Sequence, residues 1–133
     1  MPDGDANGQL SVLLVDDEPI VALRLKPALE KSGYRVEASE DGAQAIARIA
    51  QEEFDIVVTD IRMEPLDGLK VLEAALQRNA RTKVIIITGY ATVELAREAM
   101  AKGAFEVIAK PFRPNDLREV ILKAVRALEA ERS

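Results

Sequence analysis

Five short segments rich in apolar and β-branched residues alternate with longer segments of helical character, and this alternation is the strongest constraint on the fold. The β-rich segments are residues 10–15, 35–38, 54–59, 83–87 and 105–109, and a further helical segment follows the last of them. Such alternation is typical of α/β domains in which helices cover both faces of a parallel sheet. We therefore predict a single doubly wound, five-stranded parallel sheet.

Local signals place the first and last helices. Pro19 suits the first position of a helix and Gly33 suits the left-handed residue after a helix end, so residues 19–32 are predicted to form the first helix. Pro27 lies inside this segment and predicts a kink. Apolar residues at helical spacing mark the last helix: Leu117, Val120, Ile121, Ala124 and Leu128.

The strands differ in character. The first, third and fourth segments are almost wholly apolar, as the central strands of a parallel sheet are. The second segment instead alternates Val36 and Ala38 with Arg35 and Glu37. This alternation predicts that residues 35–38 form an edge strand.

The composition limits the classes of function. The chain has 133 residues, a formal charge of −5, and only two Tyr and three Phe as aromatic residues. This length fits one domain, and the negative charge and scarcity of aromatic rings argue against direct binding to nucleic acid. Cysteine and histidine are both absent. Any bound metal must therefore be held through oxygen, and catalysis through imidazole or thiolate is excluded.

The ends of the chain differ from its middle. Residues 1–9 are polar and predict a flexible tail, residues 10–128 predict the domain, and residues 129–133 fit either a tail or the start of a linker helix. No apolar stretch approaches the ~20 residues that a membrane span needs, and no charged and apolar leader opens the chain. We expect a cytoplasmic protein without membrane contacts.

Polar residues follow four of the five predicted strands. Asp16 and Asp17 follow the first, Asp60 the third, Thr88 the fourth and Lys110 the fifth. Ligands of open α/β sheets bind beyond the carboxyl ends of the strands. Neighbouring carboxylates repel one another, and a cation bound between them offsets this repulsion. Mg²⁺ prefers carboxylate and phosphoryl oxygens as ligands. We therefore predict a Mg²⁺ site at this edge.

The remaining polar groups suit phosphoryl chemistry. Lys110 and Thr88 offer an ammonium and a hydroxyl for the oxygens of a transferring phosphoryl group, and a carboxylate can act as the nucleophile. Taken singly, each residue also fits a simpler role as a helix cap, a turn former or a surface charge. Their coincidence at the ends of four strands favours a common site.

Four segments in order along the chain resemble the receiver domains of two-component response regulators. They are "LLVDDEP", "VVTDIRMEPLDG", "IIITGY" and "IAKPF". The resemblance covers residues 10 to about 128 and implies a flavodoxin-like sheet of strand order 2-1-3-4-5 with five helices. Glu64 stands where the family usually has proline, and Pro65 follows one position later. We expect an altered loop shape with the chemistry intact.

The resemblance also implies a role for each site residue. Asp60 would accept a phosphoryl group from a histidine kinase, a phosphotransfer protein or a small phosphodonor. Asp17, Asp16 and the backbone carbonyl of Arg62 would take part in binding Mg²⁺, and Asp60 would share the ion. Thr88 and Lys110 would hold phosphoryl oxygens, and the Lys110–Pro111 peptide would be cis. The domain would catalyse only its own phosphorylation and dephosphorylation, so it is not expected to be an enzyme acting on other substrates.

The sequence departs from the family pattern at a position that takes part in the activation switch of many relatives. Many relatives carry an aromatic residue three positions before the lysine, where this chain has Val107. The short side chain of Val107 cannot replace that ring. Tyr90 is the aromatic residue nearest to Thr88 in sequence. We hypothesise that Tyr90 and the helix at about residues 92–102 carry the switch, although Tyr90 could instead shield the site.

Several alternatives remain open at this stage. A small Mg²⁺-dependent phosphohydrolase resembling haloacid dehalogenases would need a second aspartate at the position of Arg62 and an inserted cap. A module that binds partners without phosphorylation is disfavoured because all five polar residues are present. A nucleotide-binding flavodoxin-like protein is disfavoured because no Gly-rich phosphate loop follows residues 10–15. A receiver would act on a downstream protein or on an output domain of a longer regulator. A homodimer formed through the fourth helix, fifth strand and fifth helix is a further alternative.

Overall fold

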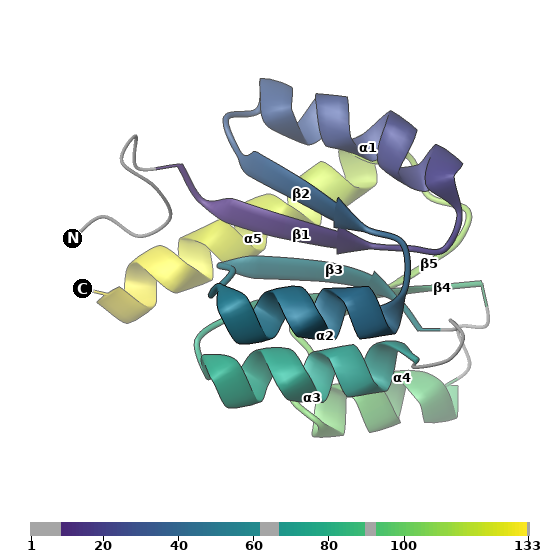
Figure 1. The fold of residues 1–133 in the computed structure, drawn as a ribbon, viewed down its shortest axis with the longest axis vertical. Coiled ribbons are helices and arrows are strands. Elements are labelled where there is room, and N and C mark those ends of the chain that lie inside the picture. Colours follow the sequence, from purple (N-terminus) through teal and green to yellow (C-terminus); the bar gives the residue numbers. More distant parts are fainter. Residues whose placement is uncertain (1–8, 62–66, 90–92, 133) are drawn as a thin grey trace.

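The computed structural model describes residues 9–61, 67–89 and 93–132. These residues form five strands that alternate with five helices (Figure 1). In chain order the elements are β1 (Ser11–Val15), α1 (Pro19–Lys31), β2 (Arg35–Ser39), α2 (Gly42–Gln51), β3 (Ile56–Asp60), α3 (Gly68–Arg78), β4 (Lys83–Thr88), α4 (Val93–Ala101), β5 (Glu106–Ala109) and α5 (Pro114–Arg132).

The strands form one parallel sheet of order β2-β1-β3-β4-β5, which confirms the predicted topology. Every residue of β1 and β3 is buried, and in β4 only Lys83 is partly exposed. The all-apolar segments are therefore the central strands, because both of their faces are covered by helices. The β2 strand lies at an edge of the sheet, as its alternating sequence predicts.

Helices cover the two faces of the sheet in separate layers. Helices α1 and α5 lie on one face, and α2, α3 and α4 lie on the other (Figure 1). Each layer contributes aliphatic side chains to its own core, such as Leu29 and Ile121 on the first face and Val71 and Leu72 on the second, all of them fully buried. These two cores hold the strand ends in place.

The ends of the first helix agree closely with the sequence signals. Helix α1 begins at Pro19 and ends at Lys31, and Gly33 has a φ of 98°, the left-handed conformation that glycine adopts without a steric penalty. The helix is continuous through Pro27. Ala38 departs from the expected pattern. Val36 is 7% exposed, but Ala38 is exposed because it borders a hollow of about 450 Å³ between α1 and the end of β2.

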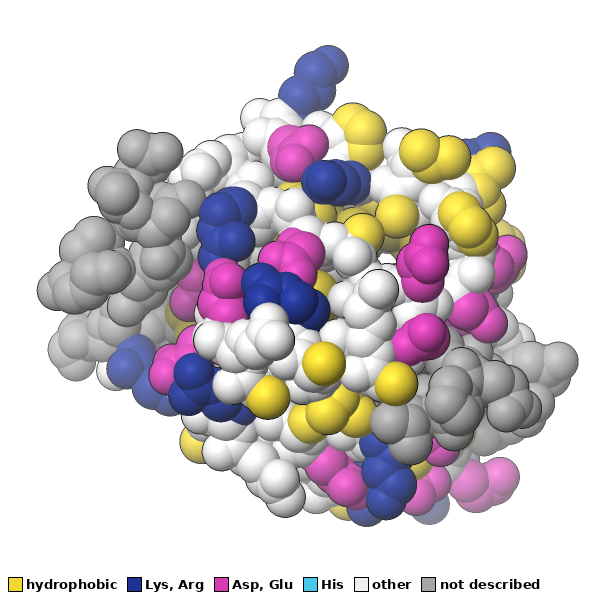
Figure 2. Space-filling model, viewed as in Figure 1, with side chains coloured by type: hydrophobic (Ala, Val, Ile, Leu, Met, Phe, Trp, Pro, Cys, Tyr) yellow, Lys and Arg dark blue, Asp and Glu magenta, His cyan; other side chains and the backbone are white. Residues whose placement is uncertain are grey.

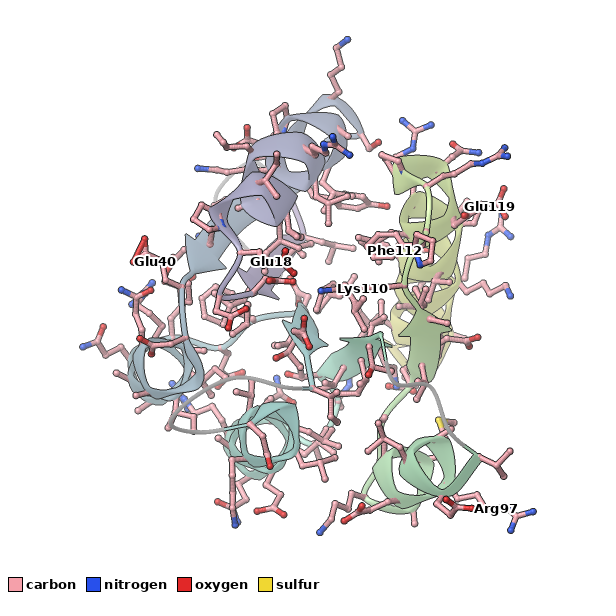
Figure 3. The ribbon with its side chains drawn as sticks, turned by 90° about the vertical axis from the view of Figure 1, so that its right-hand side faces the viewer. Glu18, Glu40, Arg97, Lys110, Phe112 and Glu119 are labelled. Carbon is pink, nitrogen blue, oxygen red and sulfur yellow. The ribbon has the colours of Figure 1, made fainter. Side chains whose placement is uncertain are left out.

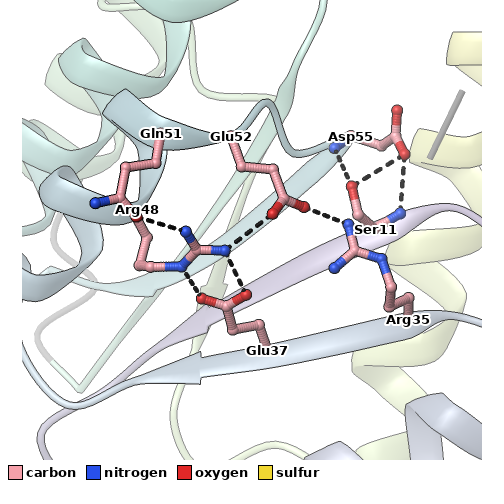
Figure 4. A network of polar contacts seen from close by, with 7 residues as sticks. All are labelled: Ser11, Arg35, Glu37, Arg48, Gln51, Glu52 and Asp55. Carbon is pink, nitrogen blue, oxygen red and sulfur yellow. Dashed lines mark hydrogen bonds and ion pairs between the residues drawn. The ribbon is translucent and has the colours of Figure 1, made fainter. Parts of the chain in front are cut away.

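A network of charged side chains ties the edge strand to α2. Arg48 on α2 donates hydrogen bonds to Glu37 on β2 and to Glu52 at the end of the helix, and Glu52 also pairs with Arg35 (Figure 4). The guanidinium of Arg48 lies 5.8 Å from the centre of the Phe54 ring. These contacts join β2 to the α2 layer across the edge of the sheet.

Charged side chains of both signs are spread over the surface that Figure 2 shows, and hydrophobic side chains gather near α1. In that helix, Ile20 is 53% and Leu23 is 73% exposed. Among the described residues, no helix combines the length and the apolar character that crossing a membrane requires.

Candidate functional site

The fold brings the predicted site residues to one edge of the sheet. Asp16 and Asp17 directly follow β1, Asp60 ends β3, Thr88 ends β4 and Lys110 directly follows β5. The strands are parallel, so their carboxyl ends lie together, and β1 and β4 are the two neighbours of β3. Asp60 is therefore in the centre of the site, with the acidic residues of β1 on one side and Thr88 on the other.

Among the described residues, Lys110 is the cation that contacts the acidic side chains of this site. Its ammonium lies 2.6 Å from Oδ2 of Asp60, 3.4 Å from Oδ2 of Asp16 and 3.3 Å from Oε1 of Glu18. In Figure 3 the Lys110 side chain extends from the β5 side of the molecule toward Glu18. Asp60 and Asp16 are 6% and 8% exposed, so their charges are shielded from water. The ammonium therefore compensates two buried carboxylates and one exposed carboxylate.

The surroundings shift the pKa values of two groups in the site. Burial raises the pKa of Asp16, and the charge of Asp60 raises it further, whereas the Glu18 amide and the Lys110 ammonium oppose the rise. Burial alone would lower the pKa of Lys110. The hydrogen bond to Asp60 and the negative charges of Asp16 and Asp60 outweigh burial, so the pKa of Lys110 lies above its ordinary value. Lys110 is therefore firmly protonated at neutral pH.

Backbone hydrogen bonds hold the strand ends that carry these side chains. The amide of Asp16 donates to the carbonyl of Ser39 on β2, and the carboxylate of Asp16 accepts from the amide of Glu18 at 2.8 Å. The amide of Lys110 donates to the carbonyl of Thr88 at 2.8 Å. The Lys110–Pro111 peptide is cis, which confirms the prediction. The site is thus assembled on rigid elements, and Thr88 itself is fully buried.

The acidic side chains are close enough to share one metal ion. One carboxylate oxygen from each of Asp16, Asp17, Glu18 and Asp60 lies within 4.8 Å of the others. A set made only of carboxylate oxygens suits a hard divalent cation such as Mg²⁺. The residues present therefore fit the predicted ion. The predicted contribution of the Arg62 carbonyl falls outside the described residues.

Sequence reasoning missed Glu18. It lies at the N-terminal end of α1, where its side chain contacts Lys110 and joins the acidic group. The run of three acids at positions 16–18 was a signal of this role, but only the structure shows that the third carboxylate points toward the site. Glu18 also borders a hollow of about 490 Å³ between α1 and the start of α5, together with Arg24, Lys110 and Phe112.

Of the two predicted switch residues, only Val107 is among the residues that the structure describes. Val107 lies on β5, is partly buried and packs against the core beneath α2, α3 and α4. Tyr90 falls outside the described residues. The altered loop predicted at Glu64 and Pro65 also lies outside them.

Comparison with known proteins places this arrangement in a family. The family model for the response regulator receiver domain matches residues 12–122. The regulatory protein AtoC of Escherichia coli K12 is 39% identical over 120 residues, which are 90% of this chain and 25% of AtoC. The C4-dicarboxylate transport transcriptional regulatory protein DctD of Pseudomonas aeruginosa is 36% identical over 132 residues, which are 98% of this chain and 28% of DctD. The chain thus spans about a quarter of the length of these two regulators.

Solved structures agree with the sequence comparison. The CheY-like response regulator receiver domain protein of Methanospirillum hungatei JF-1 superposes with a TM-score of 0.88 at 32% sequence identity. The superposition covers 92% of this chain and 98% of that protein. The similarity in structure therefore extends over nearly the whole chain.

Proposed function

Because this chain belongs to the family of response regulator receiver domains, we propose that Asp60 accepts a phosphoryl group from a histidine kinase, a phosphotransfer protein or a small phosphodonor. A receiver domain is a signalling domain, and the proposed reaction modifies the domain itself. One observation carries the assignment. Three described residues, Asp16, Glu18 and Asp60, both contact Lys110 and belong to the acidic group, and Asp60 makes the shortest contact, at 2.6 Å, from the end of the central strand β3.

The chemistry follows from the groups around Asp60. A carboxylate oxygen of Asp60 attacks the phosphorus of the donor, and the bond from phosphorus to the leaving group breaks as the new oxygen–phosphorus bond forms. The leaving group departs with the electron pair. Lys110 and Thr88 are proposed to hold phosphoryl oxygens, because a fixed ammonium and a hydroxyl compensate the charge on those oxygens. The Lys110 ammonium must then exchange part of its contact with Asp60 for the incoming group.

We propose Asp16, Asp17, Asp60 and the Arg62 carbonyl as the groups that bind Mg²⁺. Bound Mg²⁺ supplies positive charge to the carboxylates and to the phosphoryl oxygens. The exposed position of Asp17 leaves its carboxylate accessible to an ion from solvent. The carboxylates of Asp16 and Asp60 are buried close together, so a cation at this position offsets the repulsion between them.

The surface of α1 is proposed to contact the phosphodonor protein. Ile20 and Leu23 expose apolar side chains on this helix, and Ile20 borders the hollow that also contains Glu18 and Lys110. Exposed apolar side chains beside a reactive site are typical of a contact surface. Leu23→Asp is expected to slow phosphorylation by the cognate kinase while leaving phosphorylation by acetyl phosphate unchanged. Equal slowing with both donors contradicts this surface assignment.

Output is proposed to pass through a different surface, formed by α4, β5 and α5. A downstream protein, an output domain of a longer regulator or a second copy of this domain would contact α4, β5 and α5. Val93 and Met100 on α4 and Leu122 on α5 are 64%, 49% and 43% exposed, which makes these helices suitable contact surfaces.

The phosphoacceptor proposal is tested by intact-mass spectrometry with acetyl phosphate. The wild-type protein is expected to gain one phosphoryl group in the presence of Mg²⁺ and to lose this gain when the ion is chelated. Asp60→Asn is expected to gain none. Asp55→Asn is the matched control, because Asp55 precedes the amino end of β3 and its carboxylate accepts a hydrogen bond from the Ser11 amide. Equal uptake by Asp60→Asn contradicts the proposal and favours a module that binds partners without phosphorylation of this residue.

A further inference from the structure

Gly68 lies directly against the backbone that carries Asp60. It is the first residue of α3, it is buried, and its amide donates a hydrogen bond to the carbonyl of Ile61 at 2.9 Å. The side chain of Asp67 caps the same helix end by accepting hydrogen bonds from the amides of Leu69 and Lys70. The start of α3 is therefore attached to the end of β3.

No side chain fits at position 68 unless the neighbouring backbone shifts. A Cβ atom on Gly68 would lie 2.3 Å from the carbonyl oxygen of Asp60, 2.8 Å from Cα of Ile61 and 3.0 Å from the carbonyl carbon of Asp60. All three are backbone atoms, so rotation of a side chain cannot relieve the contact. The backbone of Gly68 is not in the left-handed region. Space is therefore the reason that glycine is needed here, and not backbone conformation.

Two further hydrogen bonds hold the backbone that joins Asp60 to Ile61. The hydroxyl of Thr59 donates to the carbonyl of Asp60 at 2.9 Å, and the amide of Ile61 donates to the carbonyl of Ile87 on β4 at 3.0 Å. On the α3 side, Val71 and Leu72 are fully buried in the core. The contact therefore joins two parts of the molecule that are each fixed by their own packing.

We propose that Gly68 is a positioning residue for Asp60. Because position 68 has no side chain, α3 packs against the Asp60 carbonyl, and this contact sets where the Asp60 carboxylate lies relative to Lys110. The inference rests on the proposed function of Asp60. A methyl group at position 68 requires a displacement of about 1 Å to restore ordinary contact, and misplacement of a reacting group by about 1 Å can cost about 100-fold in rate. Because β3 and α3 each take up part of this displacement, Asp60 moves by less than the full distance. We therefore expect Gly68→Ala to slow phosphorylation by about tenfold or more.

The test compares Gly68→Ala with Gly89→Ala. Gly89 follows Thr88 at the end of β4, and a Cβ atom there would meet nothing within 4 Å. Both variants add one methyl group near a strand end, but only one adds it against the Asp60 backbone. Each protein is assayed for its phosphorylation rate at saturating Mg²⁺ over a range of acetyl phosphate concentrations. Unfolding curves give the folded fraction, and amide spectra without ion or donor report the positions of Ile61 and Ile87.

The expected result is a lower maximal rate for folded Gly68→Ala, with displaced amide signals for Ile61 and Ile87 and little change in the half-saturating donor concentration. Gly89→Ala is expected to resemble the wild type. A Gly68→Ala protein that is less stable, but whose folded fraction reacts at the wild-type rate, overturns the inference, because α3 alone has then moved. If the wild type takes up no phosphoryl group, the proposed function fails and the inference fails with it.

A second variant addresses the same carbonyl if Gly68→Ala does not fold. Thr59→Val keeps the shape of the fully buried side chain and removes the hydroxyl that donates to the Asp60 carbonyl. It is expected to slow phosphorylation severalfold. A wild-type rate for Thr59→Val, together with unchanged Ile61 and Ile87 amide signals, overturns the inference.

Discussion

The ammonium of Lys110 lies 2.6 Å from the carboxylate of Asp60, although 50 positions separate the two residues in the sequence. Both are at the carboxyl ends of strands, with β4 between β3 and β5 in the sheet. Asp60 and Asp16 contact Lys110 and also belong to the acidic group proposed to bind Mg²⁺, so we expect Lys110 and the ion to compete for these carboxylates.

Replacement of Lys110 is expected to separate ion binding from phosphoryl transfer. Lys110→Met removes the positive charge beside Asp60 and Asp16, so Mg²⁺ is expected to bind severalfold more tightly in a fluorescence or calorimetric titration. Phosphorylation is expected to slow at least about tenfold, because one charge on the phosphoryl oxygens is lost. Without Mg²⁺ the variant is expected to lose about 1–3 kcal/mol of stability, because buried carboxylates lose a partner.

Lys102→Met is the matched control for this variant. Lys102 follows α4 and its ammonium lies 3.2 Å from Glu73 on α3, away from the site. It is expected to leave both Mg²⁺ affinity and phosphorylation rate unchanged. Weaker Mg²⁺ binding by Lys110→Met contradicts the competition between the ammonium and the ion.

Glu18 is expected to tune the site without being essential. Its side chain is 61% exposed, and its carboxylate contacts the Lys110 ammonium and belongs to the acidic group. Glu18→Gln keeps the shape and removes the charge, so Mg²⁺ affinity is expected to fall by a few fold with little change in stability. Glu40→Gln provides the comparison, because Glu40 is also exposed but lies on the far side of α1 from Lys110 (Figure 3). Equal titration curves for the two variants contradict a role for Glu18.

Much of this arrangement could be predicted from the sequence because strand ends in a parallel sheet are set by the ends of apolar runs. The positions of Asp60 and Lys110 follow directly from the runs before them. Two features could not be predicted in this way. The contact of Glu18 depends on the direction of an exposed side chain, and the contact of Gly68 depends on how closely α3 approaches β3. Both are results of tertiary packing, which local residue patterns do not encode.

The same limit explains the exposure of Ala38. Alternation along β2 correctly indicates which side chains share a face, and Val36 is buried on that face. Coverage of a face varies along a strand, however, and α1 leaves a hollow beside the end of β2. A period of two residues therefore predicts the direction of a side chain but not the depth of its burial.

The charged network at the sheet edge predicts a pH dependence of stability. The hydrogen bond from Arg48 lowers the pKa of Glu37, and the neighbouring cations lower it further, although burial opposes the shift. A carboxyl whose pKa is lower in the folded state stabilises the fold above its unfolded pKa of about 4.5, and this contribution is lost as the pH falls through the folded value. Glu37→Gln is therefore expected to reduce stability by about 0.5–1 kcal/mol at neutral pH.

Urea unfolding at a series of pH values measures this contribution. The difference between wild type and Glu37→Gln is expected to shrink as the pH falls below about 4.5. Glu30→Gln serves as the control, since Glu30 is exposed on α1 outside this network. A difference that stays constant from neutral to acidic pH contradicts the contribution of the Glu37 charge.

The switch hypothesis is tested by comparing amide spectra with and without beryllofluoride. The partly buried Val107 packs into the core and has no polar tip, so Val107→Ala is expected to leave the activation shifts in α4 intact. Tyr90→Ala is expected to reduce them. If Val107→Ala abolishes the shifts while Tyr90→Ala leaves them unchanged, Tyr90 is not the switch residue.

The central claim is that Asp60 carries the phosphoryl group, and peptide mapping after borohydride reduction tests it most directly. The wild-type protein is treated with acetyl phosphate and Mg²⁺, and borohydride then converts any phosphorylated aspartate to homoserine, which fragmentation mass spectrometry locates. The expected result is homoserine at position 60 alone, and only when Mg²⁺ and the donor are both present. Homoserine at Asp16 or Asp17 instead, or no homoserine at any position, contradicts the assignment.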